Sequence, residues 1–216
     1  IEEQIEGKID TEDKRPEIAK RWAIWNEEKA SRLKDESNIG LSSIAVFEAM
    51  NKVVPDNAVI AVDVGNNTYS FGRYFEPKNQ SVLMSGYLGS IGFALPAAMG
   101  AWAAQGKDRP IWSISGDGGF GQYLGEMMTL VKYNMNIKHV LLNNSELGKI
   151  SKEQKAAELD VWKTDLHNVN FSKYAENCGA LGIRVKKIEE LLPALEQLKA
   201  HNGPALLEII TDATLI

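Results

Sequence analysis

A glycine-rich turn around Asp117 has the residue types of a site that binds phosphate and a metal. In the sequence SGDGGF, Gly116, Gly118 and Gly119 surround this aspartate, between an apolar run typical of a buried strand and a segment with helical periodicity. These glycines can adopt positive φ angles and let the backbone approach a ligand closely, while N–H groups at the helix start favour an anion. Because Asp117 would repel a bare phosphate, we interpret it as the ligand of a divalent cation that lies between the two.

A second oxygen ligand is expected at the end of the next strand. The apolar run IKHVLL (137–142) is followed by Asn143 and Asn144. Parallel neighbours place their carboxyl ends along one edge of a sheet. The interval between Asp117 and Asn144 leaves room for one helix and a return strand, as a right-handed β-α-β crossover requires. The spacing therefore predicts that the glycine turn and the Asn-Asn pair meet at one site.

These segments resemble the motifs of thiamine diphosphate enzymes. GDGGF, the intervening helix and LLNN resemble the thiamine diphosphate motif, and SGYLGSIGFALPAAMGA and AVDVGNN resemble two further signatures of the superfamily. The similarity extends from about Pro16 to the carboxyl end and fits the C-terminal, diphosphate-binding domain of the pyruvate oxidase and acetolactate synthase family. Within it, NNSELGKISKEQKA, HNVNFSKYAENCGALGIRV and GPALLEI are most similar to pyruvate oxidases, including quinone-reducing pyruvate dehydrogenases.

The resemblance implies a set of cofactor-binding and metal-binding residues. Asp117, Asn144 and the backbone carbonyl of Glu146 would hold Mg²⁺ together with the diphosphate. The GNN segment would contact the diphosphate, although a plain turn also uses Asn and Gly. The predicted cofactor-binding residues are Gly65, Asn66, Asn67, Gly89, Ser90, Ile91, Gly116, Asp117, Gly118, Gly119, Asn144, Glu146, Leu147 and Gly148.

Ile91 is one bulky aliphatic residue among glycines, with Gly86, Gly89 and Gly92 around it. It is either a core isoleucine in a loop or, as the resemblance implies, the hydrophobic wedge that holds thiamine diphosphate bent. In the second case the Gly89 carbonyl and the Ile91 N–H would bind the aminopyrimidine edge. Many relatives have Met at this position, and a β-branched side chain can fill the same space.

Glu153 is the candidate catalytic residue. By resemblance it aligns with a glutamate near the substrate in pyruvate oxidases. The alternative is a solvated helix carboxylate among Lys149, Lys152 and Lys155. Lys149 stands where relatives often carry an aromatic residue, a departure that concerns the substrate contacts.

The apolar patterning predicts an α/β fold with a mainly parallel sheet of about six strands. The resemblance implies that this is the three-layer α/β/α thiamine diphosphate-binding fold. Residues 1–40 are interpreted as a linker with a docking helix after Pro16, and residues 41–216 as the cofactor-binding domain. Trp22 and Trp25 lie on the apolar stripe of that helix. The predicted helices are 42–54, 93–104, 120–133, 171–180 and 187–201, and the predicted strands include 58–65, 110–115, 137–142, 182–185 and 204–211.

Composition narrows the class of protein. The formal net charge of −5 disfavours a nucleic-acid surface. The single cysteine, Cys178, excludes an intrachain disulfide and is interpreted as a small buried residue. His139, His167 and His201 do not have the spacing of a metal site, and we expect none to be catalytic. No apolar run reaches transmembrane length, so a cytoplasmic protein is expected, with peripheral membrane association of a longer parent left open.

The resemblance also implies parts that 216 residues cannot contain. A glutamate from a separate pyrimidine-binding domain and a middle domain that holds FAD belong to the family pattern, and the chain begins with Ile1 rather than Met. We therefore expect an excised or processed C-terminal domain, inactive alone, of a homo-oligomeric parent. The parent would oxidatively decarboxylate pyruvate or another 2-keto acid, passing electrons to FAD and then to oxygen or a quinone. The alternatives are an acetolactate synthase-type carboligase, a cofactor-binding module without activity, and one subunit of a two-chain decarboxylase.

Overall fold

The computed structural model describes residues 12–35, 37–105, 108–167 and 169–215. The chain divides into two compact units, residues 1–34 and 35–216. In the described part of the first unit, helix α1 (Arg15–Arg32) has a proline in its first turn and no buried residue. Trp22 is exposed on this helix. The role of α1 as a docking helix within a linker stays a prediction.

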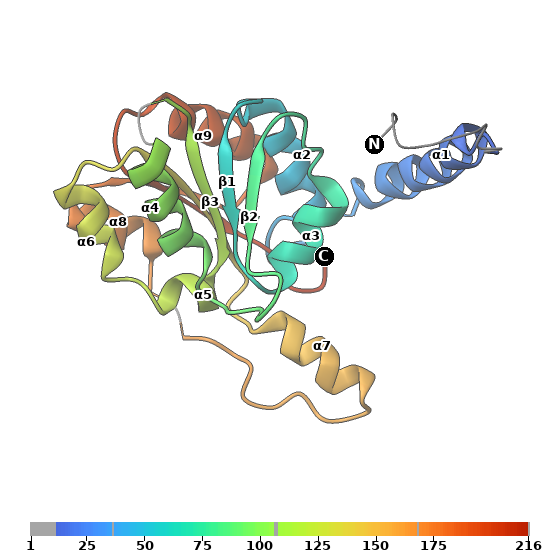
Figure 1. Ribbon diagram of the computed structural model, residues 1–216. Helices are drawn as coiled ribbons and strands as arrows, with labels where there is room; N and C mark the ends of the chain where they lie inside the picture. Colours follow the sequence, from blue (N-terminus) through green and yellow to red (C-terminus); the bar gives the residue numbers. More distant parts are fainter. Residues whose placement is uncertain (1–11, 36, 106–107, 168, 216) are drawn as a thin grey trace. The chain divides into compact units, whose positions relative to one another are not determined.

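The second unit is built on a six-stranded parallel sheet with the strand order β2-β1-β3-β4-β6-β5 (Figure 1). The central strands β1, β3 and β4 are buried almost throughout, as their continuous apolar sequences require. This architecture confirms the predicted three-layer α/β/α fold. The strands are β1 (Val59–Val62), β2 (Ser81–Met84), β3 (Ile111–Gly116), β4 (Ile137–Asn143), β5 (Leu181–Val185) and β6 (Ala205–Ile210).

Helices cover both faces of the sheet (Figure 1). One layer contains α2 (Ser43–Val53), α3 (Asn66–Tyr74) and α9 (Ile188–Ala200), in which α2 contacts both of the others. The other layer contains α4 (Ala94–Gln105), α6 (Glu126–Lys132) and α8 (Phe171–Cys178), which contact one another in that order. No helix among the described residues is long and apolar enough to cross a membrane.

The segment predicted as a single helix at 120–133 is two helices. α5 (Asp117–Gly121) ends in a turn, and α6 begins at Glu126. Glycine has low helix propensity, and Gly121 and Gly125 flank the turn. The break still lets Phe120 and Met127 enter the same core cluster. Cys178 packs against this cluster but is only half-buried, so it is less enclosed than predicted.

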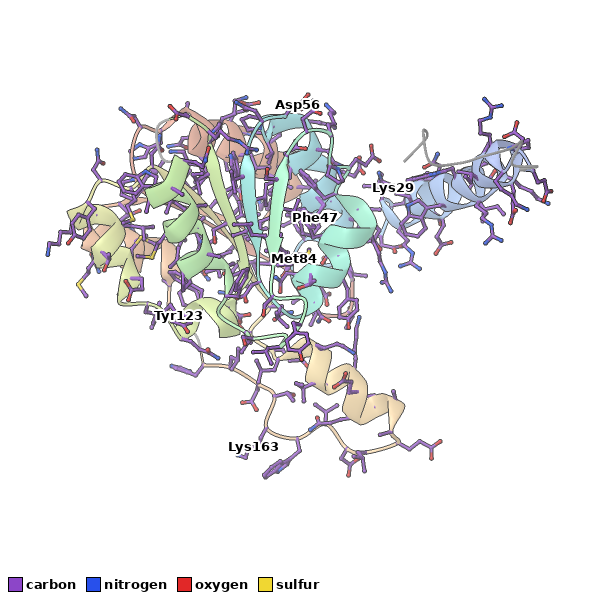
Figure 2. The ribbon with its side chains drawn as sticks, viewed as in Figure 1. Lys29, Phe47, Asp56, Met84, Tyr123 and Lys163 are labelled. Carbon is purple, nitrogen blue, oxygen red and sulfur yellow. The ribbon has the colours of Figure 1, made fainter. Side chains whose placement is uncertain are left out.

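Different segments lie at the carboxyl edge of the sheet and at the opposite edge. At the carboxyl edge, α7 (Gly148–Ala156) and the loop that follows it extend away from the sheet (Figure 1). Asp56, in the loop before β1, lies at the opposite edge (Figure 2). The order of the strands reverses between β1 and β3, where the connection after β1 leads through α3 and the connection after β3 leads through α6 on the opposite face of the sheet. Ligands of open α/β sheets bind at such points.

Candidate functional site

A cavity of about 540 Å³ lies at the carboxyl edge of the sheet. The segments following β1, β3, β4 and β6 all contribute to its lining. Every residue of the predicted cofactor-binding set lines this cavity except Ser90, whose backbone N–H donates to Ser85 Oγ at 3.2 Å. The structure therefore brings together segments that are distributed between residues 43 and 212 of the sequence.

The register of the sheet brings the glycine turn next to the Asn-Asn pair. Gly116, the last residue of β3, is opposite Leu142 of β4. Asp117 and Asn144 follow these positions, and both line the cavity. Asp117 is 3% exposed, so its carboxylate is enclosed at the first residue of α5.

The glycine turn does not use the positive φ angles that glycine allows. Gly116 has a φ of −82°, and neither Gly118 nor Gly119 has a positive φ. Glycine is required here for close packing: a Cβ on Gly118 would lie 2.8 Å from Leu147 Cδ2, and one on Gly119 would overlap Asp63 Oδ2. Gly118 and Gly119 are therefore glycines because neighbouring side chains leave too little space for a Cβ.

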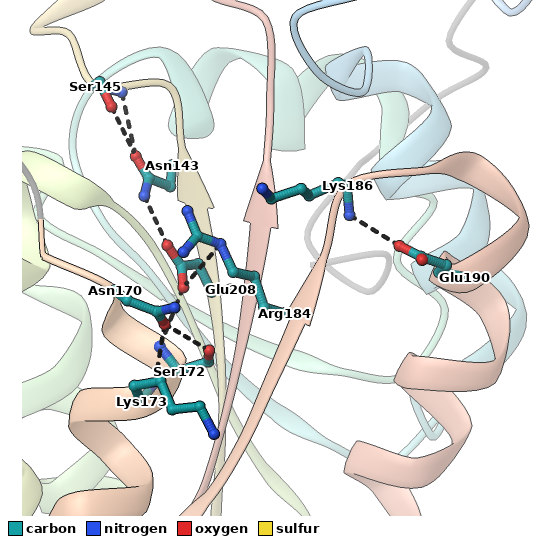
Figure 3. A network of polar contacts seen from close by, with 9 residues as sticks. All are labelled: Asn143, Ser145, Asn170, Ser172, Lys173, Arg184, Lys186, Glu190 and Glu208. Carbon is teal, nitrogen blue, oxygen red and sulfur yellow. Dashed lines mark hydrogen bonds and ion pairs between the residues drawn. The ribbon is translucent and has the colours of Figure 1, made fainter.

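The two asparagines at the end of β4 have different partners. Asn144 lines the cavity, and its Oδ1 accepts the backbone N–H of Glu146 at 3.0 Å. Asn143 instead donates from Nδ2 to Glu208 Oε1 at 2.8 Å, inside a buried network (Figure 3). Between them and Glu146, Ser145 has a φ of +56°, which reverses the chain sharply. Of the pair, only Asn144 is placed to meet a ligand in the cavity.

The residues proposed as metal ligands have suitable chemistry for Mg²⁺. Asp117 offers a carboxylate, Asn144 an amide oxygen and Glu146 a backbone carbonyl, and all three residues line the same cavity. Such hard oxygen donors, completed by phosphate oxygens and water, are the ligands that Mg²⁺ prefers. An enclosed carboxylate also favours a cation in its neighbourhood.

The loop that carries Ile91 forms another wall. Gly89 and Gly92 have φ angles of +62° and +88°, so positive φ occurs in this loop rather than in the glycine turn. Ile91 is 37% exposed and lines the cavity, and its Cδ1 would be 3.8 Å from a Cβ on Gly118. A partly exposed aliphatic side chain at a cavity wall fits the wedge position better than a core position.

Asp63, at the end of β1, was missed by the sequence prediction. It is 1% exposed, and its Oδ1 accepts backbone N–H groups from Val64 (2.8 Å), Gly92 (2.8 Å) and Phe93 (3.0 Å). Burial raises the pKa of Asp63, and these hydrogen bonds oppose that effect. The signal was an aspartate inside an otherwise apolar run, where a charge requires a partner. Asp63 holds the Ile91 loop to the sheet.

Asp63 also has contacts on its other atoms. Its backbone carbonyl accepts Nδ2 of Asn67 at 2.7 Å, which fixes the start of α3. Its Oδ2 lies against Gly119 and has no hydrogen-bond partner in the part of the chain that the structure describes. One buried residue thus contacts three walls of the cavity.

Glu153 lies outside the cavity lining. It is exposed on α7 and forms an ion pair with Lys149, with 2.7 Å between Nζ and Oε1. This hydrogen bond raises the pKa of Lys149, whose ammonium group also lies 5.3 Å from the centre of the Tyr69 ring. The placement favours the solvated helix carboxylate, and a catalytic role for Glu153 stays a prediction.

Several residues that line the cavity were missed by the sequence prediction, and three of them come from the segments around α2 and β6. Ser43 begins α2, and Thr211 and Asp212 follow β6. Asp212 Oδ2 accepts a hydrogen bond from Ser37 Oγ at 2.5 Å, which holds the segment before α2 against the end of the sheet. No local pattern distinguishes these residues, because their position depends on the pairing of distant strands.

The histidines lie away from the cavity lining. His139 is completely buried behind the glycine turn, where its Nε2 lies 3.0 Å from Ser115 Oγ and its ring contacts Phe120. Burial lowers the pKa of His139 to about 3, so the ring is neutral at physiological pH. His167 and His201 are likewise not among the described residues that line the cavity.

Comparison with known proteins identifies the family of this chain. The profile of the family described as "Thiamine pyrophosphate enzyme, C-terminal TPP binding domain" matches residues 63–209. The chain therefore belongs to the thiamine pyrophosphate (thiamine diphosphate) enzyme family, as its C-terminal, cofactor-binding domain.

Individual relatives are enzymes of more than one kind. The chain is 34% identical to a putative thiamine pyrophosphate-containing protein of Bacillus subtilis over 86% of its length and 32% of the relative. It is 34% identical to a mitochondrial acetolactate synthase catalytic subunit of Aspergillus candidus over 73% of its length and 23% of the relative. It is 28% identical to a pyruvate oxidase of Lactiplantibacillus plantarum over 82% of its length and 30% of the relative. The chain thus spans a third or less of these relatives.

Proposed function

We propose that this chain is the thiamine diphosphate- and Mg²⁺-binding part of a longer enzyme that decarboxylates pyruvate or another 2-keto acid. The observation that carries the proposal is the convergence of the glycine turn, Asp117, Asn144 and the Ile91 loop on one cavity. Asp117, Asn144 and the Glu146 carbonyl would hold the metal and the diphosphate, and Ile91 with Gly89 would hold the rings. The bound cofactor supplies the electron sink that decarboxylation of a 2-keto acid requires.

We further propose that the reaction is oxidative and delivers its electrons to FAD, as in a pyruvate oxidase. The similarity of residues 143–156 to pyruvate oxidases and the 28% identity to one such enzyme support this reading. Acetolactate synthase-type carboligation is the second candidate, because several acetolactate synthases have equal or higher identity, up to 34%. Reduction of FAD by pyruvate in the parent enzyme would favour oxidation, and formation of acetolactate would favour carboligation.

The activity requires partners beyond this chain. A pyrimidine-binding domain and an FAD-binding domain, upstream or on a partner chain, would complete the site, and a homo-oligomer would place it between subunits. The small share of each relative that the chain spans supports this proposal. If the native protein has neither of these domains, the chain is instead a cofactor-binding module without activity.

Calorimetric titration of the chain with thiamine diphosphate and Mg²⁺ tests the site. We expect binding that Asp117→Ala and Asn144→Ala each weaken by at least tenfold, because each removes one metal ligand. Asp56→Ala is the matched control, since Asp56 pairs with Lys78 at the opposite edge of the sheet. Equal affinity of all four proteins would contradict the assigned ligands, and absence of binding by the unmodified chain would contradict the site itself.

A further inference from the structure

Glu208 is a completely buried carboxylate that does not line the cavity. Figure 3 shows it within a network of polar contacts. It lies on β6, whose neighbours in the sheet are β4 and β5. A buried charge is costly unless hydrogen bonds and an opposite charge compensate it. The positions of its partners therefore indicate what this side chain holds in place.

The carboxylate of Glu208 bridges three elements. Its Oε1 accepts Nδ2 of Asn143, the last residue of β4, at 2.8 Å. Its Oε2 accepts the backbone N–H of Ser172, at the start of α8, at 3.1 Å. Arg184 of β5 lies further away, with 3.6 Å between Nε and Oε2, and its side chain is partly exposed. The closest contact of Glu208 is thus directed to the end of β4.

Asn143 transmits this contact into the turn that follows. Its Oδ1 accepts both the backbone N–H of Ser145 at 3.2 Å and the Ser145 hydroxyl at 3.3 Å (Figure 3). Ser145 has a left-handed backbone, a conformation that a residue with a side chain adopts only when its surroundings hold it there. Asn143 bonded to Glu208 on one side and to Ser145 on the other provides that support.

The turn formed by residues 143–146 carries two residues that line the cavity. Asn144 and Glu146 flank Ser145, and the Glu146 N–H donates to Asn144 Oδ1 at 3.0 Å. A change at Ser145 would therefore reorient the Asn144 amide and the Glu146 carbonyl. Outer partners of metal ligands commonly control metal affinity in this way.

We propose that Glu208 is a positioning residue, which acts through Asn143 to fix the turn that presents Asn144 and the Glu146 carbonyl to the cavity. The proposal rests on the proposed metal role of those two residues. Glu208 itself contacts neither the metal nor the cofactor. Its ion pair with Arg184 is secondary to this role.

Site-resolved amide hydrogen exchange on the chain tests the positioning directly. In Glu208→Met, which removes both acceptors while keeping the length of the side chain, we expect several-fold faster exchange at the Ser145 and Glu146 amides. Asn143→Ala removes the same connection at its other end, and we expect the same faster exchange in it. This second variant keeps the test possible if Glu208→Met does not fold. Arg184→Met is the matched control and should leave both amides unchanged. Unchanged exchange in Glu208→Met and Asn143→Ala, or an equal effect of Arg184→Met, would overturn the proposal.

Titration with Mg²⁺ in the presence of thiamine diphosphate separates this proposal from the proposed function. We expect Glu208→Met to lower the apparent metal affinity by about tenfold. If the unmodified chain binds the metal and Glu208→Met binds it equally well, the positioning role is overturned. If the unmodified chain does not bind while exchange at Ser145 responds as expected, the proposed function fails and the control of the turn by Glu208 stands.

Discussion

Asp63 Oδ1 and the backbone nitrogen of Gly92 are 2.8 Å apart, which ties the end of β1 to the loop that carries Ile91. The other carboxylate oxygen of Asp63 lies against Gly119 in the glycine turn. A single buried side chain therefore sets the separation of two cavity walls that come from different parts of the sequence. This relationship explains why residue 119 is a glycine, since a Cβ there would overlap the Asp63 carboxylate.

Replacement of Asp63 by Ala should lower both stability and cofactor affinity. The variant leaves the N–H groups of Val64, Gly92 and Phe93 without their acceptor, so we expect a loss of about 1–3 kcal/mol in the free energy of unfolding. Urea denaturation measures this loss. Asp56→Ala removes an exposed carboxylate and should change stability by less than about 0.5 kcal/mol. Equal stability of the two variants would show that Asp63 does not hold the loop.

Gly119→Ala should be destabilising because its Cβ would overlap Asp63 Oδ2. We expect a loss of about 1–3 kcal/mol, as for other cases of overpacking. Gly125→Ala is the control within the same region, since a Cβ there meets nothing within 4 Å. Thermal unfolding of the two variants decides the matter: a Gly119→Ala protein as stable as Gly125→Ala would rule out the close packing described above.

Ile91→Ala should weaken cofactor binding more than it weakens the fold. Ile91 is 37% exposed, so truncation removes less buried surface than it would at a core position. If Ile91 supports the rings of thiamine diphosphate, calorimetry should show a several-fold loss of affinity for that cofactor with Mg²⁺. The affinity for inorganic pyrophosphate with Mg²⁺ should not change, because Asp117 and Asn144 are intact. Parallel losses for both ligands would place Ile91 outside the proposed wedge role.

The chain should lose stability in mild acid because of His139. Its pKa falls from 6.5 to about 3 on burial, so between these values the unfolded state binds the proton and the folded state does not. The contribution is complete above about pH 6.5 and is lost as the pH falls, by about 2 kcal/mol at pH 5.

Urea denaturation at pH 7.5 and pH 5 measures this effect in the unmodified chain, His139→Gln and His167→Gln. His167 is exposed, so its variant should keep the full acid-induced loss, whereas His139→Gln should show a smaller one. The comparison at each pH removes the contribution of the carboxylates. An identical loss in all three proteins would mean that His139 is accessible to protons in the folded state.

Much of the fold was predictable because it depends on local patterns. The continuous apolar runs of β1, β3 and β4 match their nearly complete burial, and Ser42, the first residue of the predicted helix 42–54, is the N-cap of α2. β2 was not identified individually. Its residues are exposed or half-buried at the sheet edge, so its sequence lacks the pattern of a buried strand.

The candidate site was predictable in its residues and less so in its supports. Asp117 and Asn144 could be paired because parallel strands end at one edge. The sequence did not indicate that Asn143 bonds to Glu208, since that contact joins residues 65 positions apart. The same holds for Asp63, whose partners Gly92 and Gly119 are brought to it only by the assembled sheet.

Anomalous diffraction from crystals of the chain grown with thiamine diphosphate and Mn²⁺, in place of Mg²⁺, shows directly where the metal and the cofactor bind. We expect one anomalous peak in the cavity, bonded to Asp117, Asn144 and the Glu146 carbonyl at about 2.1 Å. The diphosphate should lie beside the glycine turn, with Ile91 against the rings. A cofactor bound elsewhere, or a metal peak away from Asp117 and Asn144, would contradict the proposed cofactor and metal site.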